Sequence, residues 1–166
     1  MKRFGLLALL LTVAVTVVGQ NSTSAWISDS DSFTNLRSAP HGTVVLTLPD
    51  TCTYMIGITN PRDGWWQVEW IEGAEEAADI PLVGSPTGKY WIHYSVLAFS
   101  TRNYGSKRWC LRATPSKKGK PVYWFSDETI ARPLDVKGDW HQVKIGNHTG
   151  WIESEMICSN PLTTCP

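Results

Sequence analysis

The chain has 166 residues, with 15 basic and 15 acidic side chains and a formal net charge of +0. A balanced charge argues against a general binder of nucleic acid or of anionic membranes. The length suits two small domains better than one large catalytic domain, and nine Trp and four Cys residues supply the packing and cross-links that small domains need.

The first 25 residues have the layout of a secretory signal peptide. Two basic residues precede a mainly apolar, uncharged run over residues 4–18, and small polar residues follow. The run is shorter than the ~20 residues that a membrane-spanning helix needs, which favours a signal over a membrane anchor. Cleavage after Gly19 and cleavage after Ala25 both fit the pattern. We therefore expect an exported protein, periplasmic or extracellular, without stable membrane insertion and with a net charge of about −2 once the two basic residues are removed.

Short runs of β-type composition alternate with turn-forming residues along the rest of the chain. These runs predict strands at residues 43–48, 54–59, 65–71, 90–97, 122–125, 129–131, 140–145 and 151–157. Regularly spaced short strands predict an all-β fold of small barrels or sandwiches. Residues 72–79 tolerate a helix but are too few to form a stable one alone, and residues 98–109 have the composition of a linker.

Two motifs recur at the same offset of 75 residues, which indicates a duplicated module. Leu-Arg-Ser-Ala-Pro at 36–40 returns as Leu-Arg-Ala-Thr-Pro at 111–115, and Trp-Trp-Gln-Val at 65–68 returns as Trp-His-Gln-Val at 140–143. A third pair, at 90–92 and 150–152, is offset by only 60, so the first copy carries an insertion at about 72–87. The sequence thus predicts a first module at 26–101 and a second at 102–166.

Four cysteines in an exported chain predict two disulfides, with three possible connectivities. A turn-rich segment separates Cys158 from Cys165, which favours a local bridge between them. Cys52 and Cys110 then form the second bridge by elimination. The cysteines lack the CxxC-like spacing of a metal site, so we expect no metal and no other cofactor.

Three motifs follow one another in the first copy: Leu-Arg-Ser-x-Pro, Gly-Trp-Trp-Gln-Val and Gly-Lys-Tyr-Trp-Ile. With Thr-Gly-Trp-Ile in the second copy, this ordered set resembles the bacterial SH3 (SH3b) family over nearly the whole mature chain. The resemblance implies an all-β chain of two small SH3-like barrels in tandem, the first with the insertion. The chain departs from the family pattern at that insertion and at Asp139, which stands where the motif has a Gly before the Trp.

The first Trp of each repeated motif is the main candidate for ligand contact. Side chains of a strand alternate between two faces, so Trp66, Val68 and Trp70 should face the core, as should their counterparts His141, Val143 and Ile145. Trp65 and Trp140 then lie on the polar face, where an indole suits a peptide or a sugar. The resemblance adds neighbouring positions, and the candidate groove residues are Trp65, Gln67, His93, Arg37, Trp140, Gln142, Glu153 and Arg112. Two alternatives stay open: each Trp covers its own barrel rim, and each Arg braces its loop.

We expect no catalysis, because the sequence has no Gly-x-Ser-x-Gly motif and two modules leave no room for a catalytic domain. The resemblance implies a peptide-like ligand, most directly a stem peptide of cell-wall peptidoglycan. The alternative partner is another exported protein, to which the chain would bind as an adaptor or inhibitor. The contact would be formed by the acidic insertion and a basic loop over residues 107–120. Open grooves at both Trp65 and Trp140 favour the first hypothesis, whereas covered Trp residues together with an apolar patch on the insertion favour the second. A third alternative, a structural spacer without a ligand, predicts neither feature.

Overall fold

The computed structural model describes residues 22–73, 80, 82–105, 107–163 and 165. Most of the expected signal peptide lies outside these residues, as does most of the helix-tolerant segment 72–79. The described residues form an all-β structure with two short 3-10 turns and no α-helix. The all-β prediction is therefore confirmed. No helix in this part of the chain is long and apolar enough to cross a membrane.

Within the described ranges, thirteen strands form one antiparallel sheet. Twelve of them lie in the order β3-β2-β6-β5-β4-β1-β7-β10-β11-β12-β8-β9, and β13 pairs with β7. The bounds are β1 (Ser22–Ile27), β2 (Phe33–Arg37), β3 (Val44–Pro49), β4 (Tyr54–Arg62), β5 (Trp65–Gly73), β6 (Tyr90–His93), η1 (Tyr94–Val96), β7 (Leu97–Thr101), β8 (Trp109–Arg112), β9 (Pro121–Phe125), β10 (Ile130–Lys137), β11 (Trp140–Ile145), β12 (His148–Glu153), η2 (Ser154–Met156) and β13 (Ile157–Cys158).

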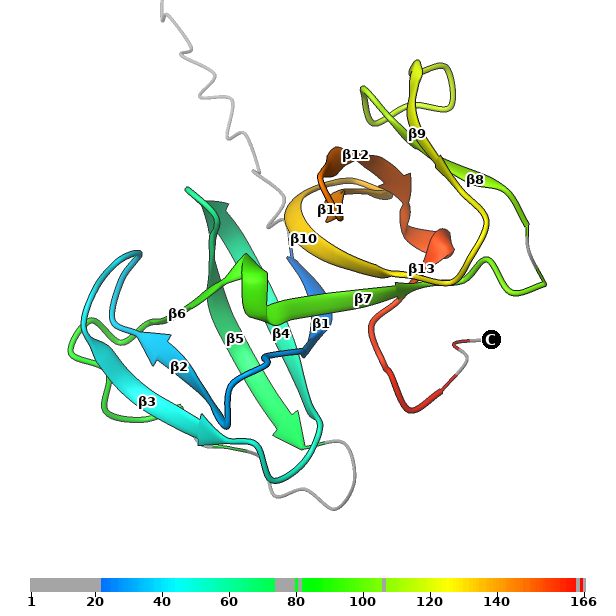
Figure 1. Cartoon of the computed structure of the whole chain (residues 1–166). Coiled ribbons are helices and arrows are strands. Elements are labelled where there is room, and N and C mark those ends of the chain that lie inside the picture. The colour runs from blue at the N-terminus through cyan, green and yellow to red at the C-terminus, as the bar shows by residue number, and fades with distance from the viewer. Residues whose placement is uncertain (1–21, 74–79, 81, 106, 164, 166) are drawn as a thin grey trace, which may run out of the picture.

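The same series of elements occurs twice. Five strands, a 3-10 turn and a strand run from β2 to β7, which we call the first repeat, and again from β8 to β13, the second repeat. From the centre of the sheet outward, the neighbours also match: β4-β5-β6-β2-β3 on one side and β10-β11-β12-β8-β9 on the other. Figure 1 shows the repeats as two lobes with β1 and β7 between them. The duplication in the sequence thus extends to the topology.

The two repeats share a well-packed join. β1 pairs with β4 and β7, and β7 pairs in turn with β10 of the second repeat. The indole N–H of Trp66 donates to the carbonyl of Pro133 at 3.1 Å, and Arg132 donates to the carbonyl of Leu97 at 2.8 Å. Buried side chains of both repeats belong to one apolar cluster. The predicted linker at 98–109 is therefore wrong in its first part, because β7 lies at the centre of the sheet with Phe99 fully buried.

The end of the expected signal peptide overlaps this join. Ala25 is fully buried in β1, and the strand begins at Ser22. Cleavage after Ala25 would remove four of the six residues of β1, whereas cleavage after Gly19 would leave the strand whole. Of the two sites that fit the sequence, the one after Gly19 is compatible with this fold.

The core pattern of the repeated strands is confirmed at five of its six positions. Trp66, Val68, His141, Val143 and Ile145 are buried. Trp70 is 40% exposed because the pairing of β5 with β4 shifts: Gly57 pairs with Trp70 but Ile58 pairs with Val68. The extra residue forms a β-bulge, and a shift of one residue reverses the faces that follow. Ile71 therefore enters the core in place of Trp70.

Candidate functional site

The second repeat carries an open pocket at the start of β11. The pocket has a volume of about 430 Å³, and its lining residues are Lys117, Asp139, Trp140, Glu153, Ser154 and Glu155. We call it the Trp140 pocket. Trp140 pairs with Glu153 across β11 and β12, so the strand register sets the indole beside the carboxylate. The N–H of Ser154 donates to the carbonyl of Asp139 at 2.8 Å and closes the end of the pocket.

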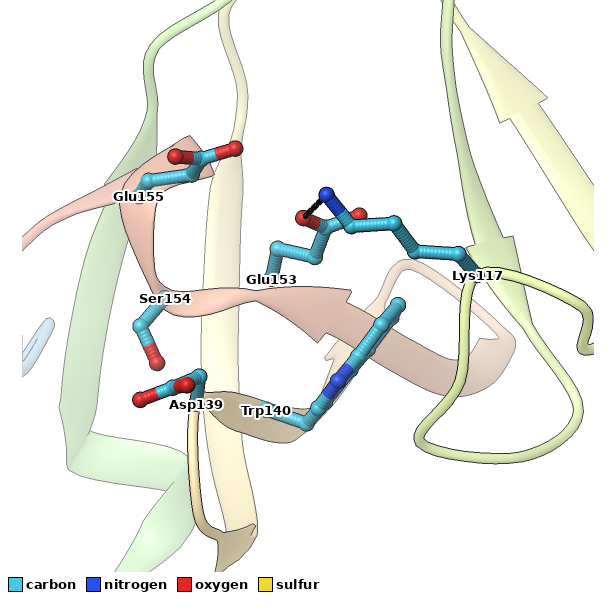
Figure 2. A pocket seen from close by; sticks show the side chains of 6 residues that line it. All are labelled: Lys117, Asp139, Trp140, Glu153, Ser154 and Glu155. Carbon is cyan, nitrogen blue, oxygen red and sulfur yellow. Dashed lines mark ion pairs between the residues drawn. The ribbon is translucent and has the colours of Figure 1, made fainter.

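A long loop supplies the opposite wall of the Trp140 pocket. Lys117 lies in the loop between β8 and β9, and its Nζ is 3.1 Å from a carboxylate oxygen of Glu153. Figure 2 shows Lys117 reaching from that loop to Glu153, beside the indole of Trp140. The pocket thus holds three carboxylates and one ammonium. It offers a flat apolar face together with an excess of negative charge, which suits a ligand with a cationic group.

The loop is held in place from its base. Nη1 of Arg112 donates to the carbonyl of Gly119 at 3.0 Å, and the N–H of Gly119 donates to the carbonyl of Ser116 at 2.8 Å. Gly119 is buried, and a Cβ there would lie 2.7 Å from the carbonyl oxygen of Thr114. The loop is therefore a braced turn. Arg112 acts as its brace, one of the two interpretations left open by the sequence.

The Trp140 pocket continues along the second repeat as two further hollows. A narrow one of about 130 Å³ has Trp140 and Glu153 in common with the pocket, and its other lining residues are Arg108, Trp109, Cys110, Arg112, Trp124, Ile152 and Met156. A wide one of about 680 Å³ shares Arg108 and Trp124 with the narrow one and runs along residues 123–129. The guanidinium of Arg108 lies 4.8 Å from the Trp124 ring centre. Together the three hollows form a groove, which we call the second-repeat groove.

The equivalent position in the first repeat is closed. Trp65 pairs with His93 as Trp140 pairs with Glu153, but Trp65 is only 8% exposed. The rings of His41 and His93 contact it edge to face at 5.4 and 5.1 Å, and the Arg37 guanidinium lies 5.7 Å from its ring centre. Burial, together with the nearby His41, lowers the pKa of His93. The expectation of an open groove at Trp65 is therefore wrong.

The difference between the repeats follows from their loops. The loop between β2 and β3 spans six residues, and its counterpart spans eight. Both use the same brace, since Arg37 donates to the carbonyl of Gly42 at 2.7 Å. In the short loop His41 takes a positive φ of 58° and its ring packs on Trp65. In the long loop Lys117 extends to Glu153 and leaves the pocket beside Trp140 open.

The candidate residues divide into three groups. Trp140, Glu153 and Arg112 line the second-repeat groove, and Trp65, His93 and Arg37 meet in the closed first repeat. Gln67 instead accepts a hydrogen bond from Asn60 at 3.2 Å, and Gln142 does not line the three hollows. The sequence interpretation missed Lys117, Asp139, Ser154 and Glu155 as pocket residues. Asp139 and Ser154 are adjacent in sequence to the candidates Trp140 and Glu153, and this adjacency could have indicated them as pocket residues.

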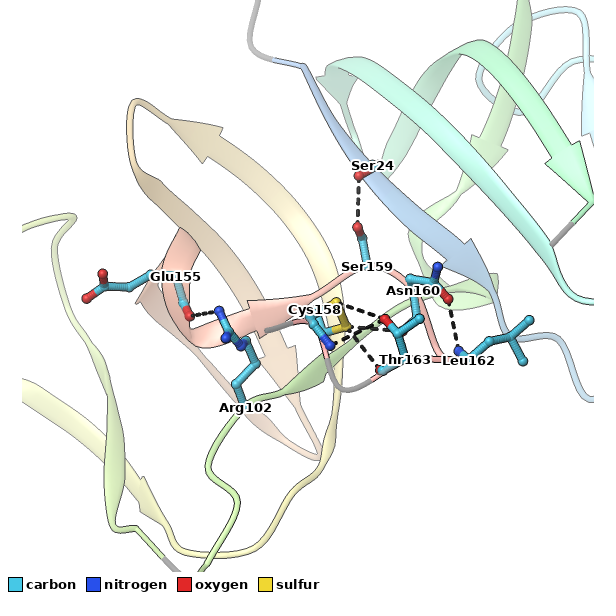
Figure 3. Close-up of a disulfide and its surroundings, with 9 residues drawn as sticks. Ser24, Arg102, Glu155, Cys158, Ser159, Asn160, Leu162 and Thr163 are labelled. Atoms are coloured by element: carbon cyan, nitrogen blue, oxygen red, sulfur yellow. Dashed lines mark hydrogen bonds between the residues drawn. A yellow bond between two sulfur atoms is a disulfide. The ribbon is translucent and has the colours of Figure 1, made fainter.

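One of the two predicted disulfides is confirmed. Cys158 and Cys165 are bridged, with their Cα atoms 5.6 Å apart, and the neighbouring Ser159 hydroxyl lies 2.9 Å from that of Ser24 in β1 (Figure 3). The bridge between Cys52 and Cys110 is wrong, because both are free thiols. Cys52 borders a small hollow of the first repeat beside Tyr54, whereas Cys110 lines the second-repeat groove. The prediction by elimination had paired two cysteines that belong to different repeats.

Comparison with known proteins gives little information about this site. No protein-family model and no curated protein matches the chain. Among solved structures, the chain is similar to NlpC1 of Trichomonas vaginalis, with 14% identity, a TM-score of 0.32 and coverage of 92% of this chain and 50% of that one. For NlpC2 of the same organism the values are 12%, 0.34, 85% and 48%. The chain thus spans about half the length of these proteins, and likenesses this weak support no conclusion on fold or function.

Proposed function

We propose that this chain is an exported, non-enzymatic binding protein of two SH3-like barrels, and that its second repeat binds a peptide-like ligand in the groove beside Trp140. The ligand that fits best is a stem peptide of cell-wall peptidoglycan. The observation that carries the proposal is the open pocket of about 430 Å³ at Trp140, next to a braced loop. Burial of the equivalent Trp65 leaves the first repeat with a supporting role.

The repeated topology supports the tandem barrels. Each repeat has five strands, a 3-10 turn and a final strand, and each has an Arg-braced loop after its first strand. This series matches the motif order from which the SH3b resemblance arises. The barrels are joined through β1 and β7, so they present the second-repeat groove on a fixed support.

The chemistry of the groove suits a peptide better than a purely apolar ligand. Trp140 and Trp124 supply flat apolar surfaces, and charged side chains of both signs lie between and beside them. Ligand sites of this kind combine apolar walls with a few polar groups that fix orientation. Acidic side chains line both ends of the groove, Glu153 at one and Asp127 and Glu128 at the other, and Arg108 lies between them.

The second candidate function is docking on another exported protein, as an adaptor or inhibitor. Trp124 and Val122 on β9 are 48% and 46% exposed, and β9 is the last strand of the sheet. Exposed apolar side chains on an edge strand suit a protein partner. The insertion at 72–87 is one of the two expected contacts, and its residues 74–79 and 81 lie outside the described residues.

Co-sedimentation with purified peptidoglycan tests the proposal. The wild type should bind saturably, and Trp140→Ala should bind at least tenfold more weakly. Trp70→Ala is the matched control, because Trp70 is 40% exposed and lies on a strand of the first repeat. Equal loss in both variants, or no binding by the folded wild type, would contradict the proposal and favour a protein partner.

A further inference from the structure

The Trp140 pocket already contains an ammonium group, which the chain itself supplies. Lys117 Nζ pairs with Glu153 at 3.1 Å, and both residues line the pocket with Trp140. The Lys117 side chain is 79% exposed, whereas that of Glu153 is only 15% exposed. The acid is thus a fixed part of the wall, and the base reaches it from solvent. Figure 2 shows this arrangement.

Exchange of this ammonium for another is easy on physical grounds. Ion pairs with an exposed partner contribute little to stability, because water solvates the released charge well. The Lys117 stem also has many rotamers that become available on release. The loop itself need not move, because Arg112 holds Gly119 independently of Lys117. A ligand can therefore replace one side chain while the pocket keeps its shape.

Glu153 is well placed to select a cationic group. A cation that replaces Lys117 meets the Glu153 carboxylate beside the indole of Trp140, in a pocket whose lining also includes Asp139 and Glu155. In the first repeat the matching position is His93, packed against Trp65 and unable to provide a permanent negative charge. The selective feature thus belongs to the second repeat.

We infer that the Trp140 pocket is a subsite for a primary ammonium on a flexible alkyl stem, and that Lys117 is a built-in competitor for it. The inference rests on the proposed function and deepens it: the bound peptide carries a free amine that pairs with Glu153. The ligand's alkyl stem packs on Trp140, and Lys117 turns out to solvent. Peptides whose amine is acylated lose this contact.

The test measures binding of soluble muropeptides before and after acetylation of their free amines, by Trp fluorescence. For the wild type, acetylation should weaken binding at least fivefold. Glu153→Gln should bind both forms equally and as weakly as the wild type binds the acetylated form. Lys117→Ala should bind the unmodified form about threefold or more tightly than the wild type. Lys118→Ala is the matched control, as a neighbouring exposed lysine outside the pocket lining, and should match the wild type.

The outcomes separate the inference from the proposed function. If acetylation leaves binding unchanged in the wild type, or if Lys117→Ala weakens binding of both forms, the inference is wrong while muropeptide binding stands. The second result would mean that Lys117 itself holds an anionic group of the ligand. If neither form binds, the proposed function fails. Binding of Nα-acetyl-lysine amide to Lys117→Ala, followed through the Trp140 indole NMR signal, would then still support the ammonium subsite, and absence of that shift would overturn it.

Discussion

The hydroxyl of Thr23 lies 2.8 Å from Nε2 of His141 and so connects β1 to the core of the second repeat. The other ring nitrogen, Nδ1, lies 3.1 Å from the hydroxyl of Ser154, which lines the Trp140 pocket. A neutral imidazole has one donor and one acceptor nitrogen, and a hydroxyl can match either. Because His141 is only 6% exposed, one neutral buried ring links the join between the repeats to the pocket.

Stability should fall as the pH drops from about 6.5 to about 4. Burial lowers the pKa of His141 to about 4, below the 6.5 of an exposed histidine. Between these values the unfolded chain binds the proton and the folded chain does not, so acid favours unfolding. At 1.36 kcal/mol per pKa unit, His141 alone should cost roughly 3 kcal/mol at pH 4 relative to pH 7.5. Urea unfolding at a series of pH values measures this loss.

Carboxylates also titrate near pH 4, so the pH series needs a variant that isolates His141. His141→Gln keeps a donor and an acceptor but cannot be protonated in this range. Its free energy of unfolding should change less between pH 7.5 and pH 5 than that of the wild type. Identical pH profiles for the two proteins would rule out the His141 assignment.

Truncation of Trp65 should lower stability much more than truncation of Trp140. Trp65→Ala removes a buried indole from between two histidine rings and should lower the free energy of unfolding by roughly 3–5 kcal/mol. Trp140 lies in an open pocket, so Trp140→Ala should cost about 1 kcal/mol. Chemical denaturation of both variants checks this. A larger loss for Trp140→Ala than for Trp65→Ala would show that their burial is misassigned.

The braced loops offer a matched pair of glycine variants. A Cβ at Gly119 would lie 2.7 Å from the Thr114 carbonyl, and one at Gly42 would lie 2.9 Å from the Ala39 nitrogen. Each alanine variant should lower stability by roughly 1–3 kcal/mol, because the backbone must shift to make room. Only Gly119→Ala should also weaken peptidoglycan binding, because its loop supplies one wall of the Trp140 pocket. If the two variants bind peptidoglycan equally well, the loop that contains Gly119 is not part of the binding site.

The two free cysteines should be distinguishable by their reactivity. Cys52 is partly exposed and Cys110 is buried. A thiol reagent should therefore modify Cys52 before Cys110 in the native protein. Unfolding without reductant should expose two reactive thiols in total. Mass spectrometry counts the added groups. If the unfolded, unreduced chain has no reactive thiol, a bridge between Cys52 and Cys110 exists after all.

The parts of the fold that the sequence predicted are those governed by local pattern. Strand composition gave the all-β class, and the repeated motifs gave the duplication that the topology reproduces. β1 was missed because it begins with three small polar residues directly after the apolar leader. β7 was interpreted as part of a linker because its pairing depends on β1 and β10, which are distant in the sequence. Such non-local pairing leaves no mark on local composition.

The site was predicted at the level of residue type but not of exposure. Trp65 and Trp140 occupy equivalent positions, and only the loop that packs beside each decides which one is open. Trp70 shows the same limit, because a bulge opposite Gly57 reversed its face. Alternation along a strand cannot reveal either effect, since both arise from neighbouring segments.

The most direct test of the central claim is an NMR titration of the indole N–H signals of the nine Trp residues with soluble muropeptides. The account predicts saturable shifts of the Trp140 signal, smaller shifts of Trp109 and Trp124 in the adjoining hollows, and no shift of Trp65 or Trp66. Shifts centred on Trp65, or no shift of Trp140 at saturating muropeptide, would contradict a ligand site in the second repeat.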